Sequence, residues 1–210
     1  MNLIELEDFK KILNFINLAE NLKIEKRNTR VSTGEHESVA AHSWRVALLV
    51  MILGENLDQE INLEKALKMA LIHDISEAIV GDLNYAEYEK SAKLVKTRSE
   101  NEKEAIIKIK QMLPENLGDE ISDLWNEFEN SQSLEAKFVQ AIDKIEAQIQ
   151  DNEMDLKYWT EYEILSSAKR LCKYCNYDTN LKNFKNLIQK QSKEKINISP
   201  FVKNSLSSEN

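Results

Sequence analysis

The chain has 210 residues, of which 42% are hydrophobic and 30% are charged, a mixture typical of a globular domain in water. Its longest apolar stretch, Val46 to Leu53, is too short to cross a bilayer, and early acidic residues argue against a signal peptide, so we expect a cytoplasmic protein without membrane contact. The formal net charge of −8 disfavours nucleic acid as a partner, and a small anionic substrate would need a cation or a few arginines at its site.

Helical periodicity dominates the chain, which has only four glycines and two prolines to interrupt it. We therefore predict an all-α fold, a helical bundle. In chain order, helices are expected at about 4–22, 39–53, 63–80, 90–113, 117–129, 134–150, 155–174 and 181–191. Gly81 should end the third helix. One domain is expected over residues 1–192, followed by a loose tail over 193–210.

Two cysteines, Cys172 and Cys175, form a C-x-x-C pair. A zinc ribbon would need a second pair, and a thioredoxin-like site would need a βαβ setting. Neither is present in the sequence. We interpret the pair as two structural thiols one turn apart on a helix.

The chain contains three histidines, and two of them, His42 and His73, fall in the most apolar predicted helices. Asp74 follows His73 directly, Glu77 should share their side of the helix, and Asp82 lies just beyond its end. Burying these charges without a partner would cost many kcal/mol, which a bound cation would relieve. For this segment alone, a core histidine with a capping aspartate remains an alternative.

Asp143 strengthens the case for a metal. It lies between Ile142 and Lys144 on an otherwise apolar helix, where an isolated acid also needs a buried partner. Two imidazoles and two carboxylates form a mixed nitrogen and oxygen set that suits one divalent cation such as Mn²⁺, Fe²⁺, Co²⁺ or Zn²⁺. Such a set leaves room for water and a phosphate oxygen.

Three segments carry a family resemblance: ESVAAHSWRVA, ALIHDISEAIVGD and AKFVQAIDKIE. In order and spacing they resemble the H…HD…D signature of the HD-domain phosphohydrolases, here spanning residues 37–144. The stretches SEAIVGD and DLWNEFENSQSLEAKFVQAIDK are similar to the 5′-deoxynucleotidase branch, in its eukaryotic-type subgroup. The resemblance covers about residues 9–150 and implies an HD-domain helical bundle around a central metal site.

The resemblance also implies roles for individual residues. The implied metal ligands are His42, His73, Asp74 and Asp143. Glu77 would orient or deprotonate the attacking water, and Asp82 would assist beside the substrate.

Substrate contacts are implied in the same way. Arg27 matches the arginine that grips the phosphate, because a guanidinium meets phosphate oxygens in a bidentate way. Bacterial members have an aromatic residue next, and here it is Asn28, which leaves the preference for deoxyribose open. Lys144, Arg30 and His36 are further candidates for substrate contact.

The expected function is hydrolysis of (deoxy)nucleoside 5′-monophosphates to a nucleoside and phosphate by a homodimer, the assembly that the resemblance implies. Hydrolysis of another nucleotide, such as a guanosine alarmone, remains an alternative. Dinuclear cyclic-dinucleotide phosphodiesterases need more histidines than this chain has, and no Gly-rich phosphate loop is present. A non-catalytic metal-binding scaffold is the third possibility, against which the presence of Glu77 and Arg27 argues.

Overall fold

The computed structural model describes residues 5–82, 92–167 and 169–198, which fold into helices and one small hairpin. The predicted all-α class is confirmed. The helices are α1 (Leu6–Ala19), α2 (Asn21–Ile24), α3 (Val39–Leu53), α4 (Leu63–Ile72), α5 (Glu77–Val80), α7 (Ala92–Met112), α8 (Glu115–Glu129), α9 (Leu134–Glu153), α10 (Glu161–Ser166), α11 (Cys172–Cys175) and α12 (Thr179–Ile198), with short 3₁₀ turns at Gly54–Asn56 and Leu156–Tyr158.

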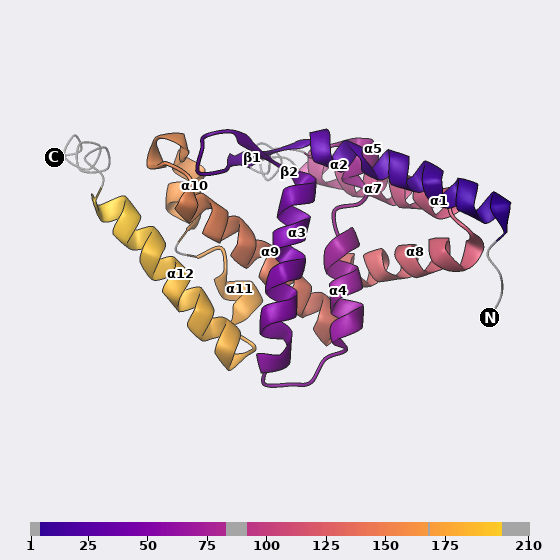
Figure 1. Cartoon of the computed structure of the whole chain (residues 1–210). Helices are drawn as coiled ribbons and strands as arrows, with labels where there is room; N and C mark the ends of the chain where they lie inside the picture. The colour runs from indigo at the N-terminus through magenta and orange to yellow at the C-terminus, as the bar shows by residue number, and fades with distance from the viewer. Residues whose placement is uncertain (1–4, 83–91, 168, 199–210) are drawn as a thin grey trace.

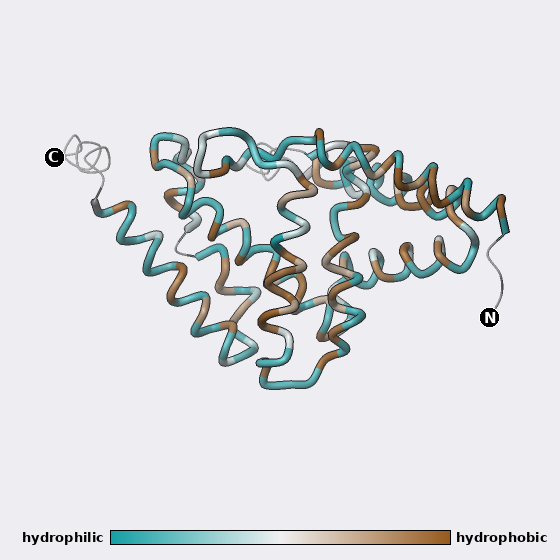
Figure 2. Tube along the Cα trace, in the orientation of Figure 1, coloured by the Kyte–Doolittle hydropathy of each residue, from teal (hydrophilic) through white to brown (hydrophobic). Residues whose placement is uncertain are grey.

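Helices α3, α4 and α9 form the centre of the molecule, with α11 and α12 on one side and α1, α7 and α8 on the other (Figure 1). Their contact surfaces are apolar because Val46, Met69, Phe138 and Ile142 are all fully buried between them. A second apolar cluster joins α2, α5, α7 and α8. Along α1 and α12 hydrophobic and hydrophilic residues alternate, as expected of helices that cover a core (Figure 2).

Local signals fix the starts of the three central helices. Ser38, Asn62 and Ser133 stand at the N-caps of α3, α4 and α9, and each side chain accepts a hydrogen bond from the backbone N–H three residues later. Such caps satisfy amides that have no partner within the helix. The caps therefore fix the residue at which each of the three central helices begins.

The single helix predicted over residues 63–80 is wrong. Helix α4 ends at Ile72, residues 73–76 form turns, and α5 begins at Glu77. The backbone N–H of Ile75 bonds to the carbonyl of Ile72, and that of Glu77 bonds to Asp74, both over three residues. Apolar residues continue across this break at helical spacing, so periodicity did not reveal it. Gly81 ends α5 as predicted, with a φ of 76°.

The segment between the first helices is a hairpin, whereas we expected a loop. Strand β1 (Lys26–Arg30) pairs antiparallel with β2 (His36–Ser38), with Lys26 opposite Ser38. Gly34 turns the chain with a φ of 94°. The charged sequence KRNTR has no strand periodicity, and the pairing lays it along α9.

The helix predicted over residues 155–174 is divided into a 3₁₀ turn, α10 and α11. Both cysteines are free and lie one turn apart on α11, as predicted. Helix α12 continues to Ile198, although we placed the start of a loose tail at residue 193. Residues 199–210, and residues 90–91 of the predicted fourth helix, lie outside the described ranges. Among the described helices, none combines the length and hydrophobicity that crossing a membrane requires.

Candidate metal centre and its cavity

Three predicted ligands come together from three helices. His42 lies on α3, His73 at the C-terminal end of α4 and Asp143 on α9, and their ligand atoms all lie within 4.8 Å of one another. All three residues are buried. Asp74 joins them, since its Oδ2 lies 3.2 Å from Nε2 of His73 and 3.8 Å from Nε2 of His42. Residues 101 positions apart in the chain thus share one site.

The orientation of the imidazoles fits a metal. Nδ1 of His73 lies 2.9 Å from the carbonyl oxygen of Ala70. A carbonyl only accepts, so Nδ1 carries the hydrogen and Nε2 presents a lone pair. That Nε2 is buried and makes no hydrogen bond within residues 5–82, 92–167 and 169–198. An unsatisfied buried nitrogen is costly in an apo site and is the atom that a cation would take up.

His42 has the same arrangement, with a carboxylate behind it. Its Nδ1 hydrogen-bonds to the fully buried Glu146, and its Nε2 lies 3.2 Å from Oδ1 of Asp143. Burial and Arg27 lower the pKa of His42, but the bonds to Asp143 and Glu146 raise it to about 9. Sequence analysis missed Glu146, although its position three residues after Asp143 on one helix was a usable signal.

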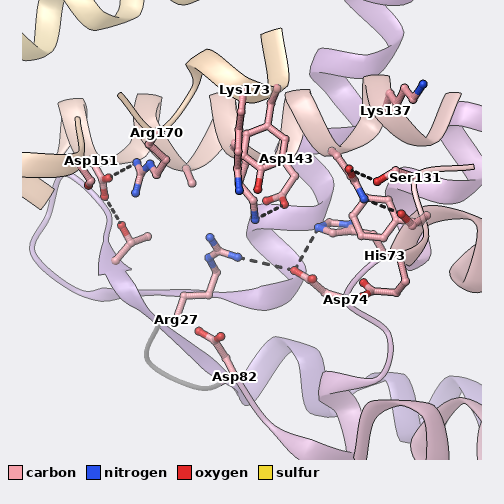
Figure 3. A pocket seen from close by; sticks show the side chains of 18 of the residues that line it. Arg27, His73, Asp74, Asp82, Ser131, Lys137, Asp143, Asp151, Arg170 and Lys173 are labelled. Carbon is pink, nitrogen blue, oxygen red and sulfur yellow. Dashed lines mark hydrogen bonds and ion pairs between the residues drawn. The ribbon is translucent and has the colours of Figure 1, made fainter. Parts of the chain in front are cut away.

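Arg27 stands at the mouth of this group. On β1, its Nη1 lies 3.7 Å from Oδ2 of Asp74 and its Nε lies 3.4 Å from the buried Glu37. Figure 3 shows the guanidinium pointing toward Asp74 across the cavity, with Asp82 on the same side. Asn28 also lines the cavity. Glu37 is a second residue that was not predicted. Its carboxylate faces Nε of Arg27 and so helps to orient the guanidinium.

Two further candidates have structural partners instead. His36 lies on β2, and its Nδ1 is 2.8 Å from the carbonyl oxygen of Arg27, so it holds the hairpin together. Arg30 donates to the carbonyl of Gly34 and stacks 4.8 Å from the ring of Tyr158. Neither His36 nor Arg30 is among the residues that line the cavity.

The acids that follow the His–Asp pair face the same cavity. Glu77, at the start of α5, is 4% exposed, and its Oε1 pairs with Arg98 of α7 at 3.0 Å. Burial, together with the charges of Asp74 and Asp82, raises the pKa of Glu77 well above its usual value. Burial also raises the pKa of Asp82, whose backbone N–H donates to Glu25.

Lys144 forms an ion pair with Asp143, one of the proposed metal ligands. Its ammonium lies 2.8 Å from Oδ2 of Asp143, while Oδ1 of the same carboxylate faces His42. Burial raises the pKa of the Asp143 carboxyl, but Lys144 and His42 hold it well below its usual range. Lys144 also lines the cavity, so its position permits the substrate contact we expected as well.

The cavity has a volume of about 1400 Å³ and opens beside the metal-ligand candidates. Binding pockets for small molecules commonly measure 300–1,000 Å³, so a mononucleotide fits with room to spare. Away from the histidines, its wall includes Asp151, Arg170 and Lys173 (Figure 3). Charged side chains thus line a cavity that His73, Asp74 and Asp143 also line.

Comparison with known proteins agrees with this geometry. The family model for the HD domain matches residues 19–176. The chain is 36% identical over 148 residues to the human 5′-deoxynucleotidase HDDC2, covering 70% of this chain and 69% of that protein. It is 36% identical over 159 residues to the 5′-deoxynucleotidase hdd1 of Schizosaccharomyces pombe, covering 73% and 77%.

Solved structures show the same fold. A protein from Magnetospirillum magnetotacticum, described as a predicted metal-dependent phosphohydrolase, superposes with a TM-score of 0.75 at 22% identity. The match covers 92% of this chain and 100% of that one.

Proposed function

The chain belongs to the HD-domain family, and from this premise we propose that it is a metal-dependent phosphomonoesterase that hydrolyses nucleoside 5′-monophosphates, deoxynucleotides among them, to a nucleoside and inorganic phosphate. One observation carries the proposal. A buried His–His–Asp group lies beside one cavity large enough for a nucleotide, and that cavity is lined by His73 and Asp143 of the group together with Arg27 and the buried Glu77.

The proposed ligands of a single divalent cation are His42, His73, Asp74 and Asp143. Nε2 of His73 supports this assignment, since among the described residues it makes no hydrogen bond, although Oδ2 of Asp74 lies 3.2 Å away. The mixed donor set suits Mn²⁺, Fe²⁺, Co²⁺ or Zn²⁺. When bound, such a cation supplies Lewis-acid polarisation of a phosphate oxygen and of water.

Arg27 is proposed to bind the phosphate. Its Nε is buried without a hydrogen bond, and its contacts with Glu37 and Asp74 are longer than hydrogen bonds. The guanidinium is therefore held in place by charge while its N–H groups remain available to phosphate oxygens. Neutralising the phosphate here lowers the cost of bringing an anion beside Asp74.

Glu77 is proposed to take the proton of the attacking water. Its Oε2 is buried and has no hydrogen-bond partner among the described residues, so it can accept a hydrogen bond. A carboxylate whose pKa is raised by burial is a stronger base near neutral pH than an exposed one. As water attacks phosphorus, the bond to the 5′-oxygen breaks, and that oxygen takes up one proton, which balances the proton that water gave to Glu77; Asp82 lies beside the substrate.

Asn28 is proposed to face the sugar. Without an aromatic ring it cannot stack, but its amide can hydrogen-bond a hydroxyl group. We therefore expect kcat/KM for dAMP and AMP to differ by less than about 10²-fold, the range that small contact differences provide. Introducing the ring by Asn28→Trp should shift selectivity toward the deoxy substrate.

The deciding experiment measures phosphate release from a panel of nucleoside and deoxynucleoside 5′-monophosphates with Mn²⁺, Co²⁺, Fe²⁺ or Zn²⁺. A guanosine alarmone is included as the alternative substrate. We expect hydrolysis of the monophosphates, and for Arg27→Ala a higher KM for all of them by a similar factor. Hydrolysis of the alarmone without release from any monophosphate would contradict the proposal.

We also place this activity in the cytoplasm and in a homodimer. Two free cysteines suit a reducing compartment. The outer side of α3 exposes Trp44, Met51 and Ile52, each more than half exposed, as a surface that a second copy would cover. Light scattering coupled to gel filtration would distinguish a dimer from a monomer.

A further inference from the structure

A buried ion pair joins α7 to the start of α5, between Arg98 and Glu77. We propose that Arg98 is a positioning residue that holds the Glu77 carboxylate in the orientation it needs to take a proton from water. This inference rests on the proposed function, in which Glu77 has that role. Nothing in the sequence pattern pointed to Arg98, because the sequence of α7 is strongly charged, as is typical of a helix that faces water.

The contact geometry engages one oxygen of Glu77 and leaves the other free. Nη2 of Arg98 lies 3.0 Å from Oε1 of Glu77. Oε2 of Glu77 is buried and makes no hydrogen bond with any residue that the structure describes. A carboxylate held through one oxygen cannot rotate freely, so the second oxygen keeps one direction. Both side chains line the cavity, which is where a water molecule would be activated.

Arg98 is itself held through a second nitrogen of its guanidinium. Its Nε pairs with Glu102, which lies four residues further along α7. The side chains of Arg98 and Glu102 are only 16% and 13% exposed. A guanidinium held through two of its nitrogens keeps one orientation, so little further side-chain entropy is lost when it pairs with Glu77. The Glu102 carboxylate therefore holds the Arg98 side chain in place.

The charges around Glu77 call for such a partner. Of the groups that face it, Asp74 and Asp82 repel its negative charge, whereas Arg27 and Arg98 attract it. Arg27 lies against Asp74 and Glu37, and we assign it to the phosphate. Within the described part of the chain, Arg98 is thus the cation that forms an ion pair with Glu77. Without it, two neighbouring carboxylates would push the Glu77 side chain away from its observed position.

The test is chemical rescue of Arg98→Ala. We expect kcat for a nucleoside monophosphate to fall about 10- to 100-fold, the scale of a misplaced catalytic group, with KM and metal content unchanged. Guanidinium chloride, far below concentrations that unfold proteins, should restore kcat saturably by filling the vacated space. Arg98→Lys should retain an intermediate kcat, because an ammonium keeps the charge but not the fork.

A matched control lies on the same helix. Lys96 pairs with Glu100 at 3.8 Å, also four residues apart, but the lysine side chain is 80% exposed. Lys96→Ala should leave kcat unchanged and should not respond to guanidinium. Glu77→Gln should lose activity and gain none from guanidinium, because the group being oriented is absent.

The possible results distinguish a failure of the role of Arg98 from a failure of the proposed function on which it rests. Wild-type protein that releases no phosphate, or a fully active Glu77→Gln, would overturn both. With those two behaving as expected, an Arg98→Ala that keeps its kcat overturns only the role of Arg98. If Arg98→Ala instead raised KM and left kcat unchanged, Arg98 would be a phosphate ligand, and this result would also overturn the positioning role. Should Arg98→Ala not fold, the kcat of Arg98→Lys decides, and a wild-type value refutes the positioning role.

Discussion

Replacing Glu146 by glutamine should weaken metal binding about 10- to 100-fold while the protein still folds. Glu146 is not one of the proposed metal ligands. It hydrogen-bonds Nδ1 of His42, the ring nitrogen that faces away from the proposed metal. Its charge makes Nδ1 the protonated nitrogen and so directs the lone pair of Nε2 toward the proposed metal. A glutamine keeps the shape of the side chain but removes the charge.

The size of the effect follows from burial. Both His42 and Glu146 are fully buried, so water does not screen the bond between them. Loss of a carboxylate behind a metal-binding histidine typically costs 10- to 100-fold in affinity, or about 1.4–2.8 kcal/mol. Competition with a chromogenic chelator would measure the affinity, and thermal melting would show that the variant folds.

Glu153 provides the matched control. Glu146 and Glu153 both pair with Arg45, at 3.2 and 2.9 Å, but Glu153 is on the surface and does not contact His42. Glu153→Gln should leave metal affinity unchanged. Its exposed ion pair with Arg45 contributes only about 0–1 kcal/mol, and that contribution is to the stability of the fold and not to the metal site. Equal affinities of Glu146→Gln and wild type would refute the reasoning, since the charge behind His42 would then be irrelevant.

Three further predictions test the site and the fold. Asp74→Ala should lose bound metal, as measured by elemental analysis, and with it the ligand-linked part of its thermal stability; equal metal in the variant and wild type would reject this ligand. Burial raises the pKa of Cys175 to about 12, so its thiolate is scarce at pH 8, and iodoacetamide followed by mass spectrometry should find Cys172 alkylated and Cys175 intact; equal labelling would show that α11 does not pack as described. Gly118→Ala should lower the urea midpoint by an amount equivalent to about 1–3 kcal/mol, because its Cβ would collide with the carbonyl oxygen of Lys110; an unchanged midpoint would mean that α7 and α8 are not in close contact.

The sequence contained enough information to predict the central helices and the four ligand candidates. Helices α3 and α9 begin within a residue of the predicted starts, because apolar periodicity and the capping serines act locally. His42, His73 and Asp143 stood out because each is a polar residue in an apolar setting. Such contrasts are visible in a linear sequence without knowledge of what lies opposite.

The missed features depend on contacts between distant segments. The turn after Ile72 is hidden by apolar residues that continue through it, and the β1 strand gains its partner only when the chain folds back. Arg98 and Glu37 look like ordinary surface charges in the sequence. Their roles come from Glu77 and Arg27, which lie 21 and 10 positions away, and no spacing rule links those pairs.

The distribution of the ligand candidates along the chain also affects how the protein unfolds. His42 and Asp143 are separated by 101 positions, so an ion held by both is a cross-link that closes about half of the chain into one loop. For a loop of about 100 residues, a permanent link restricts the unfolded chain by about 4.7 kcal/mol in the chain-entropy account. The centre forms only after α3, α4 and α9 have all met, so the ion would contribute little to the folding transition state and would act mainly by slowing unfolding. Loss of the metal would then shorten the lifetime of the folded chain and expose the interior to proteases sooner, while the speed of folding would hardly change.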